Sequence, residues 1–167
     1  MTGVPNPQPA HAVIMVRFAD ECITKMHQVT SKLAATMGPD TADLSIRVGL
    51  HSGTATGGVL RGHKARFQLF GDSMNTAARM ESHGLAGQIH VSEETAKALS
   101  AQGKSHWVTP RKDQLNVKGK GILQTFWVSN RNVRETSCPG TSVVYADDES
   151  VPKSDEKFQR FESCVEV

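Results

Sequence analysis

The stretch Arg66-Phe67-Gln68-Leu69-Phe70-Gly71-Asp72-Ser73-Met74-Asn75-Thr76-Ala77-Ala78-Arg79-Met80-Glu81-Ser82 decides the fold of this chain. Its apolar, aromatic run from Phe67 to Phe70 is typical of a short buried strand. Gly71-Asp72-Ser73 then predicts a turn and a helix N-cap. Residues 74–82 are predicted to be helical, because they are good helix formers and include no glycine or proline.

Asn75 and Arg79 lie four positions apart, so both should project from one face of this helix. An amide and a guanidinium are then presented together just beyond a strand end, where ligands usually sit in α/β folds. A guanidinium fork suits phosphate oxygens. The spacing alone more often accompanies an ordinary surface helix, in which Arg79 is solvated or pairs with a carboxylate such as Glu81.

Before this stretch, the sequence predicts an extended segment, a long helix and two strands. Residues 1–9 are rich in proline and are expected to be extended. Residues 10–37 predict one amphipathic helix that ends at Gly38-Pro39. Its apolar stripe comprises Ile14, Phe18, Cys22, Met26, Val29, Leu33 and Met37. Asp20 and Glu21 lie off the stripe, so we expect both to be solvated.

Residues 44–50 alternate apolar and polar side chains, which predicts a half-buried strand, and residues 54–60 predict its neighbour. Gly57-Gly58 indicates a bulge or a close backbone approach, or less often a phosphate-binding loop. His51 could be a catalytic base, although a lone histidine at a strand end is more often a hydrogen-bonded structural residue.

After this stretch, we expect a strand at 89–91, a helix capped by Ser92, an irregular segment at 102–113, and a hairpin of 115–118 with 122–128. Lys118 and Lys120 flank the hairpin turn. Lysines there are usually solvated, although such a turn can also bring an ammonium group to a triphosphate. Residues 131–167 are polar and poor in apolar residues, so we expect a disordered tail.

The composition limits the number of domains and the classes of function that this chain can have. A chain of 167 residues with a net charge of +2 allows one domain and argues against nucleic-acid binding. No apolar run reaches the roughly 20 residues of a membrane span. The three cysteines are far apart, which indicates free thiols in a reducing, cytoplasmic setting.

The order and spacing of four sequence blocks resemble the class III adenylyl and guanylyl cyclase catalytic domains over residues 10–130. The blocks are Arg47 to Gly53, Phe70 to Ser82, Gly87 to Thr95, and Val117 to Gly121. The resemblance implies an α+β, partly ferredoxin-like fold. It also implies conversion of GTP or ATP to the 3′,5′-cyclic nucleotide plus pyrophosphate, in intracellular cyclic nucleotide signalling.

The resemblance also implies roles for individual residues. Arg79 would stabilise charge at the α-phosphate and Asn75 would orient the ribose. Lys118 would hold the terminal phosphates. Phe70, Gly71 and Asp72 would complete the substrate site with Gln68, which stands where adenylyl cyclases usually have Asp and guanylyl cyclases Cys. A glutamine amide can pair with either purine edge, but the surrounding residues look more like the guanylyl branch, which favours GTP.

The family domain begins with strands that carry two metal-binding aspartates, and this chain has no comparable segment. The resemblance therefore implies the C-terminal part of a domain that uses Mg²⁺ or Mn²⁺, with the metal ligands absent from this chain. We expect the chain alone to be inactive and marginally stable. The family's active site lies between two domains, so a second cyclase domain is the expected partner, with membrane attachment only through other parts. A non-catalytic, nucleotide-binding or regulatory subunit remains the alternative.

Overall fold

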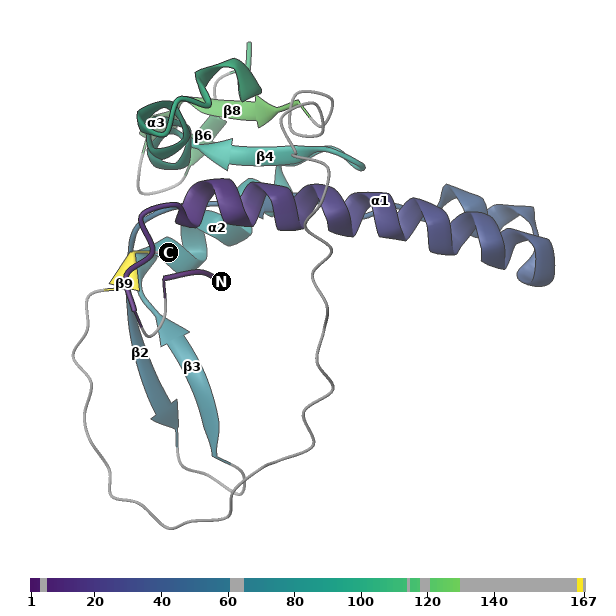
Figure 1. Ribbon diagram of the computed structural model, residues 1–167, viewed down its shortest axis with the longest axis horizontal. Coiled ribbons are helices and arrows are strands. Elements are labelled where there is room, and N and C mark those ends of the chain that lie inside the picture. Colours follow the sequence, from purple (N-terminus) through teal and green to yellow (C-terminus); the bar gives the residue numbers. More distant parts are fainter. Residues whose placement is uncertain (4–5, 61–64, 114, 118–120, 130–164, 167) are drawn as a thin grey trace.

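The computed structural model describes residues 1–3, 6–60, 65–113, 115–117, 121–129 and 165–166. Lys118, Lys120 and nearly all of the expected tail lie outside these residues. The described part is α+β, as predicted (Figure 1). It has a mixed four-stranded sheet, a three-stranded sheet, a two-stranded sheet and three α-helices. No helix within it is long and apolar enough to cross a bilayer.

The four-stranded sheet forms the centre of the core. Its order is β1 (Val48–Leu50), β4 (Ile89–Ser92), β8 (Thr125–Val128) and β5 (Val108–Pro110). β1 and β4 are parallel, whereas β8 is antiparallel to both β4 and β5. All four residues of β4 are buried, because β4 has a strand on either side and helices packed against it. The sequence predicted the strand at 89–91, but not the pairing of 108–110 with β8.

The long helix α1 (His11–Met37) has the predicted length (Figure 1). It buries a different face from the predicted one. Its buried residues are Ala12, Val16, Ala19, Asp20, Ile23 and Thr30. The predicted stripe is largely exposed, with Ile14, Phe18, Val29, Leu33 and Met37 all open to solvent. The buried residues form a second stripe of the same period, and its alanines allow closer packing against the sheet. Asp20 belongs to this second stripe, so its predicted solvation was wrong.

β2 (Thr54–Leu60) and β3 (Arg66–Phe70) form an antiparallel ribbon that extends away from the helices (Figure 1). β3 was predicted to be buried, but Phe67 is 58% and Phe70 is 41% exposed, because no layer of the described residues covers the ribbon. Gly57 and Gly58 pair in continuous register, without a bulge. A Cβ at Gly57 would lie 2.8 Å from the Phe67 ring, so this glycine makes room for a cross-strand aromatic side chain.

The remaining elements are short. α3 (Glu93–Ala101) begins at Ser92, whose hydroxyl accepts a hydrogen bond from the Thr95 amide, as the sequence predicted for a capped helix. The predicted hairpin is split, because β6 (Leu115–Val117) pairs with β7 (Gly121–Leu123) while β8 joins the main sheet. The short helices are η1 (Pro39–Asp43) and η2 (Ser105–Trp107), and β9 (Val165–Glu166) pairs with the start of β2.

Candidate nucleotide site on helix α2

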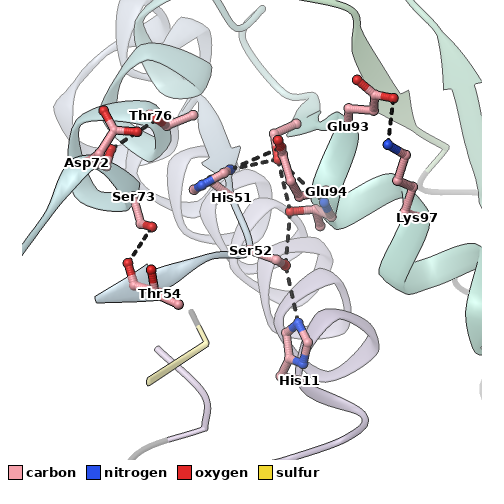
Figure 2. Close-up of polar contacts among 12 residues, drawn as sticks. His11, His51, Ser52, Thr54, Asp72, Ser73, Thr76, Glu93, Glu94 and Lys97 are labelled. Carbon is pink, nitrogen blue, oxygen red and sulfur yellow. Dashed lines mark hydrogen bonds and ion pairs between the residues drawn. The ribbon is translucent and has the colours of Figure 1, made fainter. Parts of the chain in front are cut away.

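Helix α2 (Asp72–Ser82) follows β3 after a single residue, Gly71. Gly71 has φ +131°, a backbone conformation that only glycine adopts readily, so the sharp change of direction depends on this residue. The helix begins two residues before the predicted start at Met74. Ser73, a candidate N-cap, instead donates a 2.6 Å hydrogen bond to the Thr54 carbonyl, which fastens the first turn of α2 to β2 (Figure 2).

The other end of α2 packs closely on β1. A Cβ at Gly49 would lie 2.0 Å from the Glu81 amide nitrogen and 2.5 Å from the Met80 carbonyl carbon. The two backbones therefore approach as closely as they do only because residue 49 is glycine. Arg47, which precedes β1, adds an ion pair of 2.9 Å with Glu81. Both ends of α2 are thus fixed relative to neighbouring strands.

The candidate residues occupy one continuous unit of β3, Gly71 and α2. Gln68 and Phe70 share one face of β3, and both are exposed. Asn75 and Arg79 are one helical turn apart on α2; Asn75 is exposed and Arg79 is half-buried. Asp72, the first residue of α2, is also exposed. Lys118 lies outside the described residues, so its predicted place at this site stays a prediction.

The side-chain amide of Asn75 and the guanidinium of Arg79 form no hydrogen bond or ion pair with other residues that the structure describes. The alternative in which Arg79 pairs with Glu81 is not realised, because the Glu81 carboxylate pairs with Arg47. An amide and a guanidinium are therefore available to a ligand at the edge of α2. Such a pair can donate several hydrogen bonds to phosphate or sugar oxygens.

The C-terminal end of α2 is held by side chains that sequence reasoning did not identify. His90 Nδ1 lies 2.7 Å from the Met80 carbonyl oxygen, and Arg111 donates to the His83 carbonyl at 2.8 Å. Burial lowers the pKa of His90, and the positive charge of Arg111 lowers it further, although the bond to Met80 opposes both effects. His90 was missed because an inward-facing histidine in a short strand has no sequence signature of its own.

His51 belongs to a polar network beside α2 (Figure 2). Its Nδ1 atom lies 2.8 Å from the Ser92 hydroxyl and 3.5 Å from Glu94. Ser52 continues the network, since it accepts a hydrogen bond from Thr95 at 3.1 Å and also contacts His11. These bonds join the end of β1 to the start of α3 and of α1, which fits the structural alternative for His51.

A cavity of about 180 Å³ adjoins this network between α1, β1 and α2. Its walls include His11, Met15, Leu50 and Thr95. Among the described residues of α2, Ala77 lines this cavity, whereas Asn75 and Arg79 do not. The candidate nucleotide site is consequently an open surface of α2 and β3 rather than this cavity.

The described residues do not fit a metal centre. No group of three or more histidine, cysteine, aspartate or glutamate side chains among them is arranged to hold an ion. Asp72 contributes a single carboxylate at the start of α2. A Mg²⁺ or Mn²⁺ site normally needs several oxygen ligands, so this part of the chain offers no complete set.

Comparison with known proteins identifies the family. The sequence profile of the adenylate and guanylate cyclase catalytic domain matches residues 1–130. Guanylate cyclase soluble subunit beta-2 of Rattus norvegicus is 36% identical over 151 residues, which is 89% of this chain and 21% of that protein. An adenylate cyclase of Mycobacterium bovis is 32% identical over 133 residues, covering 80% of this chain and 28% of the relative.

Solved structures of cyclase domains are similar to this chain in both fold and sequence. The guanylate cyclase domain of RhGC from Catenaria anguillulae, in complex with GTP, has a TM-score of 0.62 and 38% identity, covering 77% of this chain and 64% of that domain. The chain therefore spans under two thirds of this solved domain and less than a third of either relative. On the profile match and these similarities, the chain belongs to the adenylate and guanylate cyclase catalytic domain family.

Proposed function

We propose that this chain contributes the nucleotide-binding helix of a nucleotide cyclase that converts GTP, rather than ATP, to its 3′,5′-cyclic form and pyrophosphate. The observation that carries the proposal is the placement of Asn75 and Arg79 on successive turns of α2, with their polar ends available beside exposed Gln68. Membership of the cyclase family makes a nucleoside triphosphate the ligand that this arrangement would serve.

In this reaction the ribose 3′-hydroxyl attacks the α-phosphate of the same nucleotide and expels pyrophosphate. Negative charge grows on the α-phosphate oxygens in the transition state, and a cation fixed there lowers the barrier. Arg79 would supply this cation. Asn75 would hold the ribose so that its hydroxyl faces the phosphorus, and Lys118 would hold the terminal phosphates. Phe70, Gly71 and Asp72 would contribute to the same open surface.

The choice of base would fall to Gln68. Its exposed side chain on β3 carries both a donor and an acceptor, so it can pair with either purine edge. The relatives include guanylate and adenylate cyclases, which leaves both nucleotides within the range of the family. The preference for GTP rests on the residues around Gln68, which look more like those of the guanylyl branch.

Mg²⁺ or Mn²⁺ would neutralise the triphosphate and activate the hydroxyl in a complete domain. The described residues lack a donor set for such an ion, so the metal ligands would come from outside them. We propose that a second cyclase domain, identical or different, completes the site. A cytoplasmic location and a role in intracellular cyclic nucleotide signalling belong to the same proposal, as does inactivity of the chain alone.

A non-catalytic role is the second candidate, and the lack of a metal donor set in the described residues favours it. In that role the chain would bind a nucleotide, or it would bind another cyclase subunit and regulate that subunit. A regulatory subunit has no need of a cation at the α-phosphate, however. Retention of Arg79, whose guanidinium pairs with no other described residue, therefore favours the enzyme.

Equilibrium binding tests the nucleotide site directly. Isothermal titration of the full chain with GTP, ATP and inorganic pyrophosphate should give saturable binding, tightest for GTP. Arg79→Ala should weaken GTP binding by about tenfold, the usual worth of a hydrogen bond to a charged group. Lys112→Ala, on an exposed lysine outside the site, is the control and should bind as wild type does. Equal binding by Arg79→Ala and wild type would contradict the proposed site.

A further inference from the structure

The end of α2 presents carbonyl groups that need partners from elsewhere in the chain. The last four carbonyls of any helix have no intrahelical amide to accept from. Here the backbone amides of His83 and Gly84 bond to the carbonyls of Arg79 and Glu81, at 3.1 and 2.9 Å. The carbonyls of Met80 and of the C-cap residue His83 are instead met by side chains from beyond α2.

His90, on the central strand β4, meets the first of these carbonyls. Its ring is fully buried, and its Nδ1 lies 2.7 Å from the Met80 oxygen. A carbonyl only accepts, so Nδ1 must carry the proton and donate. The other ring nitrogen, Nε2, is buried without a hydrogen-bond partner among the described residues, which favours the neutral ring.

Trp127 and Arg111 extend this contact. The Trp127 ring packs against His90 at a tilt of 31°, with a centroid distance of 4.6 Å. The Arg111 guanidinium lies 5.2 Å from the Trp127 centroid. Arg111 also donates to the His83 carbonyl at 2.8 Å. A cation at a helix C-terminus is favoured by the helix dipole, and it is favoured again over an indole face.

We propose that His90, Trp127 and Arg111 form a clamp of positioning residues that fixes the C-terminal end of α2 and thereby directs Arg79 at the nucleotide. The proposal rests on the proposed function, because it assumes that Arg79 binds phosphate. None of the three clamp residues needs to touch the nucleotide. They act through the Met80 and His83 carbonyls, and Met80 is the residue next to Arg79.

The geometry explains why such a clamp would matter. Arg79 projects from the last turns of α2, where helices tend to fray. Errors of about 1 Å in the placement of a catalytic group can cost about a hundredfold in rate. The clamp, with the close approach of Gly49, holds this end from two sides. The Asn75 end is fixed separately through Ser73, so loss of the clamp should disturb Arg79 more than Asn75.

A double-mutant cycle on the full chain tests the clamp through GTP binding. His90→Leu removes the donor, and His90→Asn restores a donor near the position of Nδ1. His90→Leu should weaken GTP binding by about three- to tenfold, and His90→Asn should recover most of the loss. Combined with Arg79→Ala, His90→Leu should add no further loss. A surface histidine replaced in His27→Leu is the matched control and should bind as wild type does.

A second pair of variants covers the case in which His90→Leu does not fold. Arg111→Met removes the bond to the His83 carbonyl from a partly exposed side chain, and Arg111→Lys keeps a donor there. Only Arg111→Met should weaken GTP binding. If His90→Leu and Arg111→Met fold and bind GTP as wild type does, or if either loss adds in full to that of Arg79→Ala, the clamp proposal is wrong.

Amide hydrogen exchange separates failure of the clamp from failure of the proposed function. Without any nucleotide, His90→Leu and Arg111→Met should speed exchange at residues 83–84 more than at residues 75–76. If wild type binds no GTP but this pattern appears, the proposed function fails while the holding of α2 stands. If exchange is unchanged in both variants, the clamp does not exist.

Discussion

At the scale of single residues, the functional proposal rests on Asn75 and Arg79 of α2, and we propose that the buried His90 positions Arg79. The helical spacing of Asn75 and Arg79 was sufficient to predict that they share a face, because α-helix geometry is local. His90 was not predictable in this way. Its partner, Met80, lies ten residues away in a different element, so the contact depends on how α2 docks against β4.

His90 should make stability depend on pH. Burial lowers its pKa below the ordinary 6.5, with Arg111 and His83 also lowering it and the bond to Met80 opposing them. The unfolded chain therefore binds the proton more readily than the folded chain, so unfolding becomes easier as the pH falls below about 6.5. The contribution of His90 to the free energy of unfolding is fully present above that pH.

Urea denaturation at pH 5.5 and pH 7.5 measures this effect. The wild-type midpoint should be lower at pH 5.5. His90→Asn, which has no titrating ring, should show a smaller difference between the two pH values. An identical pH dependence in both proteins would show that a different group is responsible.

At the scale of elements, sequence patterns predicted most helices and strands but not which of their faces would be buried. The long helix spans the predicted residues, yet it buries Ala12, Val16 and Ala19 rather than the larger stripe through Phe18. Two stripes of the same period compete on one helix, and periodicity cannot choose between them. Likewise, the aromatic residues of β3 suggested burial, but none of the described elements forms a layer over the ribbon.

Gly49→Ala should separate α2 from β1. The added Cβ would lie 2.0 Å from the backbone of Glu81, so one of the two elements must move. We expect a loss of about 1–3 kcal/mol in unfolding free energy, the usual cost of overpacking. Gly58→Ala is the matched control, because a Cβ there meets nothing within 4 Å. Equal stability of the two variants in urea would contradict the close approach of α2 to β1.

At the scale of the whole molecule, α1 presents an exposed apolar side that the described residues leave uncovered. We expect parts of the cyclase domain outside the described residues, or a second domain, to cover this side. The chain should accordingly unfold in a broad transition rather than a sharp one. Sequence reasoning could foresee this only through the family resemblance, because composition does not reveal what an apolar surface packs against.

Substitutions on the two sides of α1 should therefore differ in effect. Ile23 is 2% exposed, and Ile23→Ala should cost about 2–5 kcal/mol of unfolding free energy. Phe18 is 53% exposed, and Phe18→Ala should change stability by less than about 0.5 kcal/mol. Urea denaturation of the two variants at one pH provides the comparison. A larger loss for Phe18→Ala would mean that the predicted stripe, rather than the stripe through Val16 and Ile23, faces the core.

The central claim is that α2 of this chain supplies the α-phosphate cation of a cyclase completed by a second domain. Its most direct test mixes the full chain with a guanylate cyclase domain that retains its metal-binding aspartates but whose own signature arginine is alanine, and measures cyclic GMP formed. Association of the two proteins is checked by sedimentation. The wild-type chain should restore activity, and Arg79→Ala should restore about 100- to 1,000-fold less. Association without restored activity, or equal activity with Arg79→Ala, would contradict the account.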